Sequence, residues 1–264
     1  MLLVGLSVTI VIFLIILIAA QILIPTTKAD AFSDFDWSSS WTDLDWKARA
    51  GANCKPISTI HRKMGAISPW IWVVPDSCEQ GLPHTRSIDV IAIPKSYPKE
   101  RLESTLEHEK IHLYQRAMPE SWAKFYRIKW RYDIYTKPPA GIPNELVSMR
   151  RANPDTADAP WCCWMGKYWS VPVYENTYNL SLSKAHIKWW DQVTNIITRN
   201  PPDEWVTFFG PDVHQSEHPH EISAEFLSGP LLNQDDAIQS SSQAMNLLSY
   251  AWNEEEMIPS IYNY

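Results

Sequence analysis

The sequence has little glycine and a deficit of positive charge. Only 8 of its 264 residues are Gly, and we find no glycine-rich phosphate-binding loop. Lys and Arg together number 23 against 30 Asp and Glu, so the net charge is −7. Because nucleic-acid binding needs clustered basic side chains, we expect no nucleic-acid partner. The nearest basic run lies on a predicted helix, where we expect it to face solvent: Lys124, Arg127, Lys129 and Arg131.

Cysteine is also scarce. The four cysteines, Cys54, Cys78, Cys162 and Cys163, include no CxxC pair, which argues against a cysteine zinc site. Their number is even and a signal-like segment precedes them, so two disulfides are possible, with three connectivities. We expect Cys162 and Cys163 to bridge separately to Cys54 and Cys78 rather than to each other. Such disulfides would place the domain in an oxidising space.

Charged side chains are absent from the N-terminus until Lys28, and Leu2–Ile24 is nearly all apolar. As a helix of ~1.5 Å per residue this run would cross a hydrocarbon core of ~30 Å, so residues 1–24 predict a transmembrane anchor. The alternative is a secretory signal cleaved near Ala29 or Ala31. Signal cores are shorter, ~7–15 residues, and follow basic residues that this chain lacks. We expect a single-pass, bilayer-anchored protein with its domain outside the cytoplasm, or a secreted protein if the segment is cleaved.

The rest of the chain predicts a short linker followed by an α+β domain. We expect residues 25–50 to form a stalk and residues 51–264 to form the domain. Two segments bounded by proline and rich in β-branched or aromatic residues predict strands, Ser68–Pro75 and Ser87–Pro94. Residues 136–180 are rich in Pro, Trp and Asn, and they predict a long irregular insertion.

Apolar residues at helical spacing predict several helices. Within one of them Trp122, Phe125 and Tyr132 belong to an aromatic stripe that we expect to pack in the core. The predicted helices are Pro98–Met118, Glu120–Tyr135, Leu182–Arg199, a short helix from about Pro219 to before Gly229, and Ala237–Trp252. The domain should therefore combine a small β-sheet with a mainly helical C-terminal part.

The helix over 98–118 carries the motif HExxH. His108 and His112 lie four residues apart, so both imidazoles project from one face and can bind one metal ion. Glu109 lies beside them, where it can accept a proton from a metal-activated water. The alternative is that the two histidines sit on an ordinary helix and bind nothing.

A second segment supplies a third candidate ligand. Glu221 and Glu225 lie four residues apart on the short helix that starts near Pro219. A catalytic zinc site needs three protein ligands and an open position, so we expect Glu221 to complete it. Glu225, one turn further on, could hold a ligand histidine by a hydrogen bond. Other candidates for the third ligand are Glu225 itself or one of His214, His218 and His220, and both acids could instead face solvent.

These two segments resemble the gluzincin class of zinc metallopeptidases, which pair HExxH with a downstream helix of type ExxxD or ExxA(D/E). Glu221, Ala224 and Glu225 match the second element, and Gln115 matches the variant HExxHxxQ. The resemblance covers about 20 residues. It implies a zincin-like domain in which zinc is bound by His108, His112 and Glu221, with Glu225 in the second shell. A Glu at 225 departs from the commoner Asp. The metzincin pattern does not fit, because Gln115 and Met118 occupy its Gly and His positions.

The resemblance also implies peptide hydrolysis with Glu109 as general base and a peptide or protein as substrate. Negative charge on the carbonyl oxygen needs a donor, for which His218 or His220 are the candidates, with Tyr114 and Tyr126 as weaker ones. An edge strand within 68–94 could align the substrate by β-addition. One alternative is an inactive zincin-like structural or binding protein of a membrane or particle envelope. Another is a different zinc-dependent hydrolase.

Overall fold

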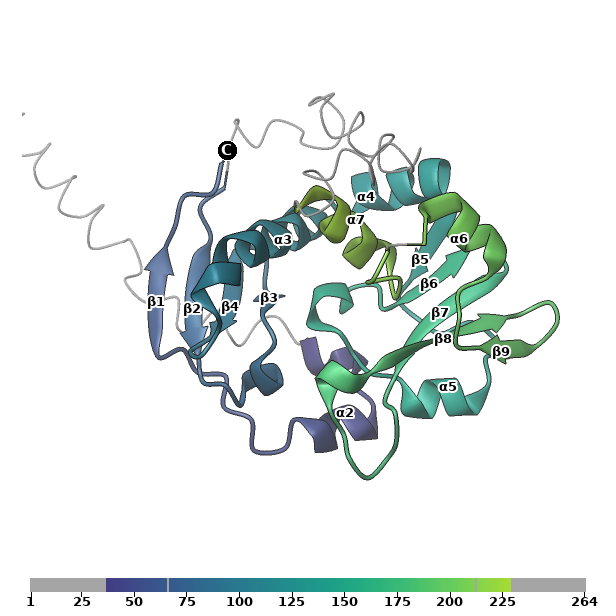
Figure 1. Cartoon of the computed structure of the whole chain (residues 1–264), viewed down its shortest axis with the longest axis horizontal. Coiled ribbons are helices and arrows are strands. Elements are labelled where there is room, and N and C mark those ends of the chain that lie inside the picture. Colours follow the sequence, from purple (N-terminus) through teal and green to yellow (C-terminus); the bar gives the residue numbers. More distant parts are fainter. Residues whose placement is uncertain (1–36, 66, 212, 229–264) are drawn as a thin grey trace, which may run out of the picture. The chain divides into compact units, whose positions relative to one another are not determined.

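A computed structural model describes residues 37–65, 67–211 and 213–228, which form an α+β fold with two separate sheets (Figure 1). Contacts divide the chain at Asp36, and all of the described residues belong to the second unit. In the described ranges we find no helix that is both long and apolar enough to span a bilayer. The anchor predicted over 1–24 and the helix predicted over 237–252 lie outside these ranges, so both stay predictions.

The first sheet has the strand order β1-β2-β4-β3, with β2 and β4 parallel and the outer pairs antiparallel. The strands are β1 (Ser58–His61), β2 (Trp70–Val74), β3 (His84–Arg86) and β4 (Val90–Pro94). The strands predicted at 68–75 and 87–94 are confirmed as β2 and β4. Both are central and apolar, and Ile71, Ile91 and Ile93 pack on the helix α3 (Lys99–Ala117).

Helix α3 matches the helix predicted over 98–118, and it ends where Pro119 interrupts it. The next predicted helix, Glu120–Tyr135, is only partly correct. This segment forms α4 (Pro119–Phe125), followed by one π-turn (Tyr126–Trp130). Arg131 has left-handed backbone angles and ends the turn, and strand β5 (Tyr132–Tyr135) follows. The predicted aromatic stripe is buried at Trp122, Phe125 and Tyr132, and the four basic side chains of this segment are exposed, as expected.

The second sheet is antiparallel, in the order β5-β6-β7-β8-β9. Its further strands are β6 (Trp161–Trp164), β7 (Tyr168–Val173), β8 (His186–Asp191) and β9 (Ile196–Thr198). Helix α5 (Asn144–Met149) lies between β5 and β6 in the chain, and helix α6 (Asp203–Phe209) follows β9. The helix predicted over 182–199 is therefore wrong. Trp189 is buried against Trp205 of α6, but Val193, four residues further on, lies in the β8–β9 turn with 74% of its surface exposed. Pairing with β7 overrides the helical spacing.

Residues 136–180 are not an irregular insertion. They contain α5 and strands β6 and β7, two of the three interior strands of the second sheet, so they are part of its framework. Trp161, Trp164 and Trp169 of this segment are buried. Composition alone suggested a loop because Pro and Asn are frequent there, yet the strands between them form a core.

The stalk predicted over 25–50 does not extend through 37–50. A 3₁₀ turn (Trp37–Ser40) leads to α2 (Asp43–Ala48), which Thr42 begins with a capping box. Asp45 is fully buried and forms an ion pair of 2.9 Å with Arg49, which also pairs with Glu79 at 2.8 Å. This segment is therefore packed into the domain. Residues 25–36 lie outside the described ranges.

The predicted disulfide pairing is also wrong. Cys54 and Cys78 bond to each other, whereas Cys162 and Cys163 are buried free thiols in β6. Adjacent residues of a strand face opposite sides of a sheet. Cys162 accordingly belongs to one apolar cluster and Cys163 to another, whereas Cys54 and Cys78 belong to a third. The single disulfide closes the loop that contains β1 and β2.

Candidate metal centre

Helix α7 (Pro219–Leu227) confirms the short helix predicted near Pro219, and it packs against α3. Its start is well defined, because Pro219 occupies the first turn and the ring of His218 caps the helix by accepting from the N–H of His220 at 3.1 Å. The contact between α3 and α7 brings together residues more than one hundred positions apart in the sequence.

The three predicted metal ligands meet at this contact. The Nε2 atoms of His108 and His112 are 3.1 Å apart, and Oε2 of Glu221 lies 3.4 Å from the first and 3.5 Å from the second. Ligands at ~2.0–2.1 Å from a tetrahedral zinc ion are separated from one another by ~3.3–3.4 Å. Two imidazole nitrogens and one carboxylate oxygen also form a donor set that suits zinc. The residues present therefore fit the ion.

Glu109 lies beside this group and is buried, with 4% of its surface exposed. Among the described residues, its Oε2 has no hydrogen-bond partner, as expected of an atom that awaits a water or a substrate proton. Burial, and then the negative charges of Asp155 and Glu221, raise the pKa of Glu109 well above its usual value. A carboxylate with a raised pKa is suited to proton transfer near neutral pH.

Charge within the site also changes the pKa values of the ligands in the metal-free chain. Burial alone would lower the pKa of His112, but the carboxylates of Glu221 and Asp155 outweigh it and raise the pKa to about 10. Burial would raise the pKa of Glu221, but His112 and His108 lower it well below its usual value. The two helices therefore attract each other through opposite charges when no metal is bound.

The residue that orients His112 is Gln115. Nδ1–H of His112 donates to Oε1 of Gln115 at 2.8 Å, so Nε2 is the ring nitrogen that faces His108 and Glu221. Glu225, which we predicted for such a role, instead accepts from the backbone N–H groups of His214 and Gln215. The signal for Gln115 was present in the sequence, since it lies three residues after His112 on the same helix face.

Glu221 is oriented by Asn153, a residue that the sequence did not single out. Nδ2 of Asn153 donates to Oε1 of Glu221 at 2.8 Å, on the side of the carboxylate away from the histidines. Asn153 precedes the 3₁₀ turn Pro154–Thr156, 68 residues before Glu221. No motif links the two positions, so only the fold reveals the contact.

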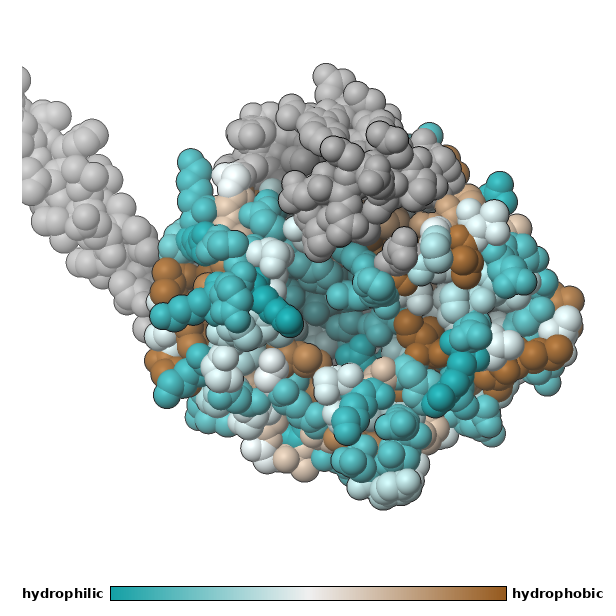
Figure 2. All heavy atoms as spheres, viewed as in Figure 1, coloured by the Kyte–Doolittle hydropathy of each residue, from teal (hydrophilic) through white to brown (hydrophobic). Residues whose placement is uncertain are grey.

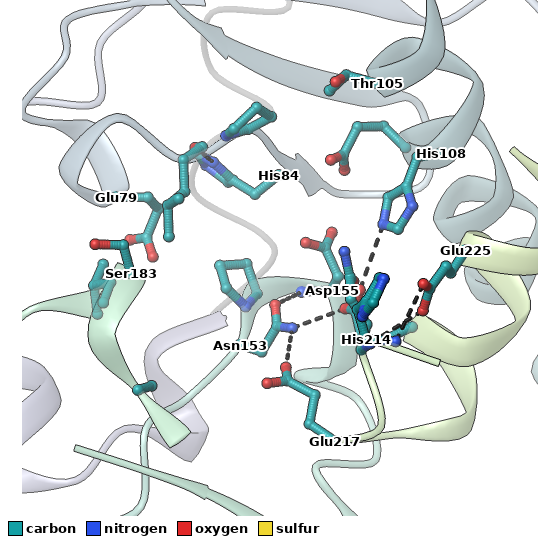
Figure 3. Close-up of a pocket in the computed structure, with 18 of the residues that line it drawn as sticks. Glu79, His84, Thr105, His108, Asn153, Asp155, Ser183, His214, Glu217 and Glu225 are labelled. Atoms are coloured by element: carbon teal, nitrogen blue, oxygen red, sulfur yellow. Dashed lines mark hydrogen bonds and ion pairs between the residues drawn. The ribbon is translucent and has the colours of Figure 1, made fainter. Parts of the chain in front are cut away.

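The metal centre opens into a cleft of about 770 Å³. Figure 2 shows it as a central hollow lined mostly by hydrophilic side chains, and in Figure 3 His108, Asn153, Asp155, Glu217 and Glu225 surround it. One wall comes from α3 and the segment before β3, and the other from the segments around 151–155, 182–187 and 214–217. The cleft gives the candidate ligands and Glu109 access to a substrate.

His218 and His220 do not line this cleft. His218 is buried at 2% exposure, and its Nε2 bonds the carbonyl of Ala159 at 3.0 Å, while burial lowers its pKa to about 4. His220 packs against the rings of His218 and Tyr126, and burial lowers its pKa well below the usual value. Their positions do not support the predicted role at a carbonyl oxygen. Of the three histidines near the start of α7, His214 lines the cleft.

The edge strand predicted to align a substrate is also engaged. Strands β2 and β4 are central, and the sheet edge next to α3 is β3. The N–H of Thr85 in β3 donates to Oδ1 of Asp155 at 2.8 Å. Addition of a substrate strand to this edge would require that bond to break.

Comparison of the chain with protein-family models, with curated proteins and with solved structures finds no match. The functional argument therefore depends on the geometry of the site.

Proposed function

We propose that the protein is a zinc-dependent peptidase with His108, His112 and Glu221 as metal ligands and a zincin-like arrangement of α3 and α7. The observation that carries the proposal is the convergence of three ligand atoms within 3.5 Å of one another, beside a buried glutamate with an unpaired oxygen. A structural zinc site has four protein ligands and no need of a general base.

When bound, zinc supplies an activated water, with a pKa lowered from ~15.7 toward ~7, and polarises the carbonyl to be cleaved. Oε2 of Glu109 takes the proton of the attacking water and later delivers it to the leaving amine. His112 is kept in the required tautomer by Gln115, and Glu221 is held by Asn153. The residues of the cleft bind and orient the peptide.

The proposed location is the outer side of a membrane, to which residues 2–24 attach the domain, with secretion if that segment is cleaved. Support comes from the apolar N-terminal run and from the disulfide Cys54–Cys78, since disulfides persist in oxidising compartments.

Metal analysis and one conservative substitution test the proposal. Purified protein should contain about one zinc ion per chain and hydrolyse an unfolded protein, with chelation removing both. Glu109→Gln should retain the zinc and lose about 10²–10⁴-fold in kcat. Glu107→Gln, on the exposed side of the same helix turn, is the matched control and should retain activity. Protein without stoichiometric zinc, or activity that survives Glu109→Gln, would refute the proposal. Zinc bound without any turnover would favour the inactive, zincin-like binding protein.

A further inference from the structure

The amide of Asn153 forms hydrogen bonds through both its oxygen and its nitrogen. Oδ1 accepts from the N–H of Asp155 at 3.0 Å and so caps the 3₁₀ turn that follows. Nδ2 donates to Oε1 of Glu217 at 2.6 Å and to Oε1 of Glu221 at 2.8 Å. Figure 3 shows Asn153 pointing toward Glu217 within the cleft. These contacts also define which end of the amide is nitrogen, because only nitrogen can donate to two carboxylates.

The two oxygens of Glu221 therefore have different partners. Oε1 is bound by Asn153, whereas Oε2 faces His108 and His112. A carboxylate with one oxygen held in this way presents a single oxygen to a metal. A free carboxylate can bind with both oxygens and fill an additional coordination position.

The amide is itself held in place by a partly buried ion pair. Glu217, which shares the amide nitrogen, forms an ion pair of 2.9 Å with Arg151. Arg151 balances the charge of Glu217, so two carboxylates can lie on one neutral amide. An aspartate at 153 would place a third carboxylate against them.

We propose that Asn153 is a positioning residue that restricts Glu221 to one-oxygen coordination, which keeps a position open for water and substrate. This inference rests on the proposed zinc site. Bound zinc can be catalytic only if the protein ligands leave one coordination position open. If Glu221 bound with both oxygens, it would fill that position.

The test uses Asn153→Ser in the full chain. Serine is a good cap and can maintain the 3₁₀ turn, but it has no amide to donate to Glu217 and Glu221. Asn176→Ser is the matched control, because Asn176 also caps a turn through its oxygen and does not line the cleft. Both proteins are loaded with zinc and, separately, with Co²⁺, whose visible and X-ray absorption spectra report the number of ligands. Asn153→Asp serves as a second variant if Asn153→Ser does not fold.

We expect Asn153→Ser to bind zinc at least as tightly as the wild type, while the Co²⁺ first shell gains one oxygen. The value of kcat should fall by roughly 10–100-fold with a smaller change in KM. Asn153→Asp should lose the same order of kcat. The control should match the wild type in all three readouts.

Two results would overturn the inference. One is an unchanged Co²⁺ spectrum with unchanged kcat. The other is a loss of metal affinity with an unchanged number of ligands, which a purely structural role predicts. Failure of the peptidase proposal looks different: the wild type would then bind zinc without turnover, and the Co²⁺ spectrum of Asn153→Ser would still decide the coordination question.

Discussion

At the scale of single residues, Gln115 joins the two helices of the site. Its Oε1 accepts from His112, and its Nε2 donates to the carbonyl of His220 at 3.0 Å and to Oγ of Ser223 at 2.9 Å. One buried amide thus sets both the tautomer of a ligand and the distance between α3 and α7. Buried polar groups with every bond satisfied specify a unique arrangement.

Replacing Gln115 by Leu should weaken zinc binding by roughly 10–100-fold, because His112 loses the acceptor that fixes its ring. Competition with a chromophoric chelator measures the affinity. Gln192→Leu is the control, since Gln192 makes side-chain bonds of the same kind in the β8–β9 turn. Equal affinities for both variants would contradict the assignment.

Zinc binding should also release protons. The pKa of His112 in the metal-free chain is raised to about 10, so its ring is charged at pH 7–8, and only the neutral ring binds a metal. Apparent affinity should therefore fall about tenfold for each pH unit below about 10. Calorimetry should give heats of zinc binding that change in proportion to the ionisation enthalpy of the buffer. Heats independent of the buffer would show that the ring is already neutral.

At the scale of elements, those with strong local signals were predicted, among them strands β2 and β4 and helices α3 and α7. The helices at 98–118 and near 219 match α3 and α7, because their spacing, prolines and caps are local signals. The segment 182–199 has a helical pattern of apolar residues and still forms β8 and β9. A strand is stabilised by a partner elsewhere in the chain, here β7, which a local pattern does not reveal.

The disulfide is an element-scale constraint with a measurable effect. Cys54 and Cys78 are separated by 24 residues, and closing a loop of this length stabilises a fold by about 3 kcal/mol. Reduction should lower the free energy of unfolding of the wild type by about this amount, as measured by urea denaturation. The double variant Cys54→Ser/Cys78→Ser should be equally destabilised and insensitive to reductant.

A thiol count provides a separate check on the pairing. Denatured, unreduced protein should react with a thiol reagent at Cys162 and Cys163 alone. A product with no free thiols would restore the pairing that the sequence suggested.

At the scale of the whole molecule, buried histidines make stability depend on pH. His84 is buried, and its Nε2 accepts from Nε of Arg86 at 2.8 Å, so its ring is neutral. Burial and then the charge of Arg86 lower its pKa from 6.5 to about 3. The unfolded chain therefore binds a proton at a pH where the folded chain does not, and stability is lost as pH falls below 6.5.

Between pH 6.5 and 5, His84 alone should reduce the free energy of unfolding of metal-free protein by about 1.6 kcal/mol, with a slope that approaches ~1.36 kcal/mol per pH unit. His218, with a pKa lowered to about 4, should act in the same direction. Urea denaturation across this range measures the slope. His84→Asn should be less stable at pH 7 but show a shallower dependence on pH. An identical slope in this variant would exclude His84 as the source.

The sequence by itself determined the face of α3 that carries His108, Glu109 and His112, and the turn of α7 that carries Glu221. These depend on residue spacing within a single helix, and the helix repeat translates spacing directly into direction. Their meeting within 3.5 Å, with Glu221 as the third partner, was predicted from chemistry and agrees with the structure.

Only the tertiary structure decided the partners of these residues. Two of these features join segments that are distant in the chain: the contact of Asn153 with Glu221 and the pairing of Cys54 with Cys78. Two others depend on how segments pack: the hydrogen bonds from the 214–215 backbone to Glu225 and the burial of His218 and His220. Such contacts depend on which surfaces are buried against each other, and a hydrogen bond or disulfide forms only where the packed backbone brings its partners within reach.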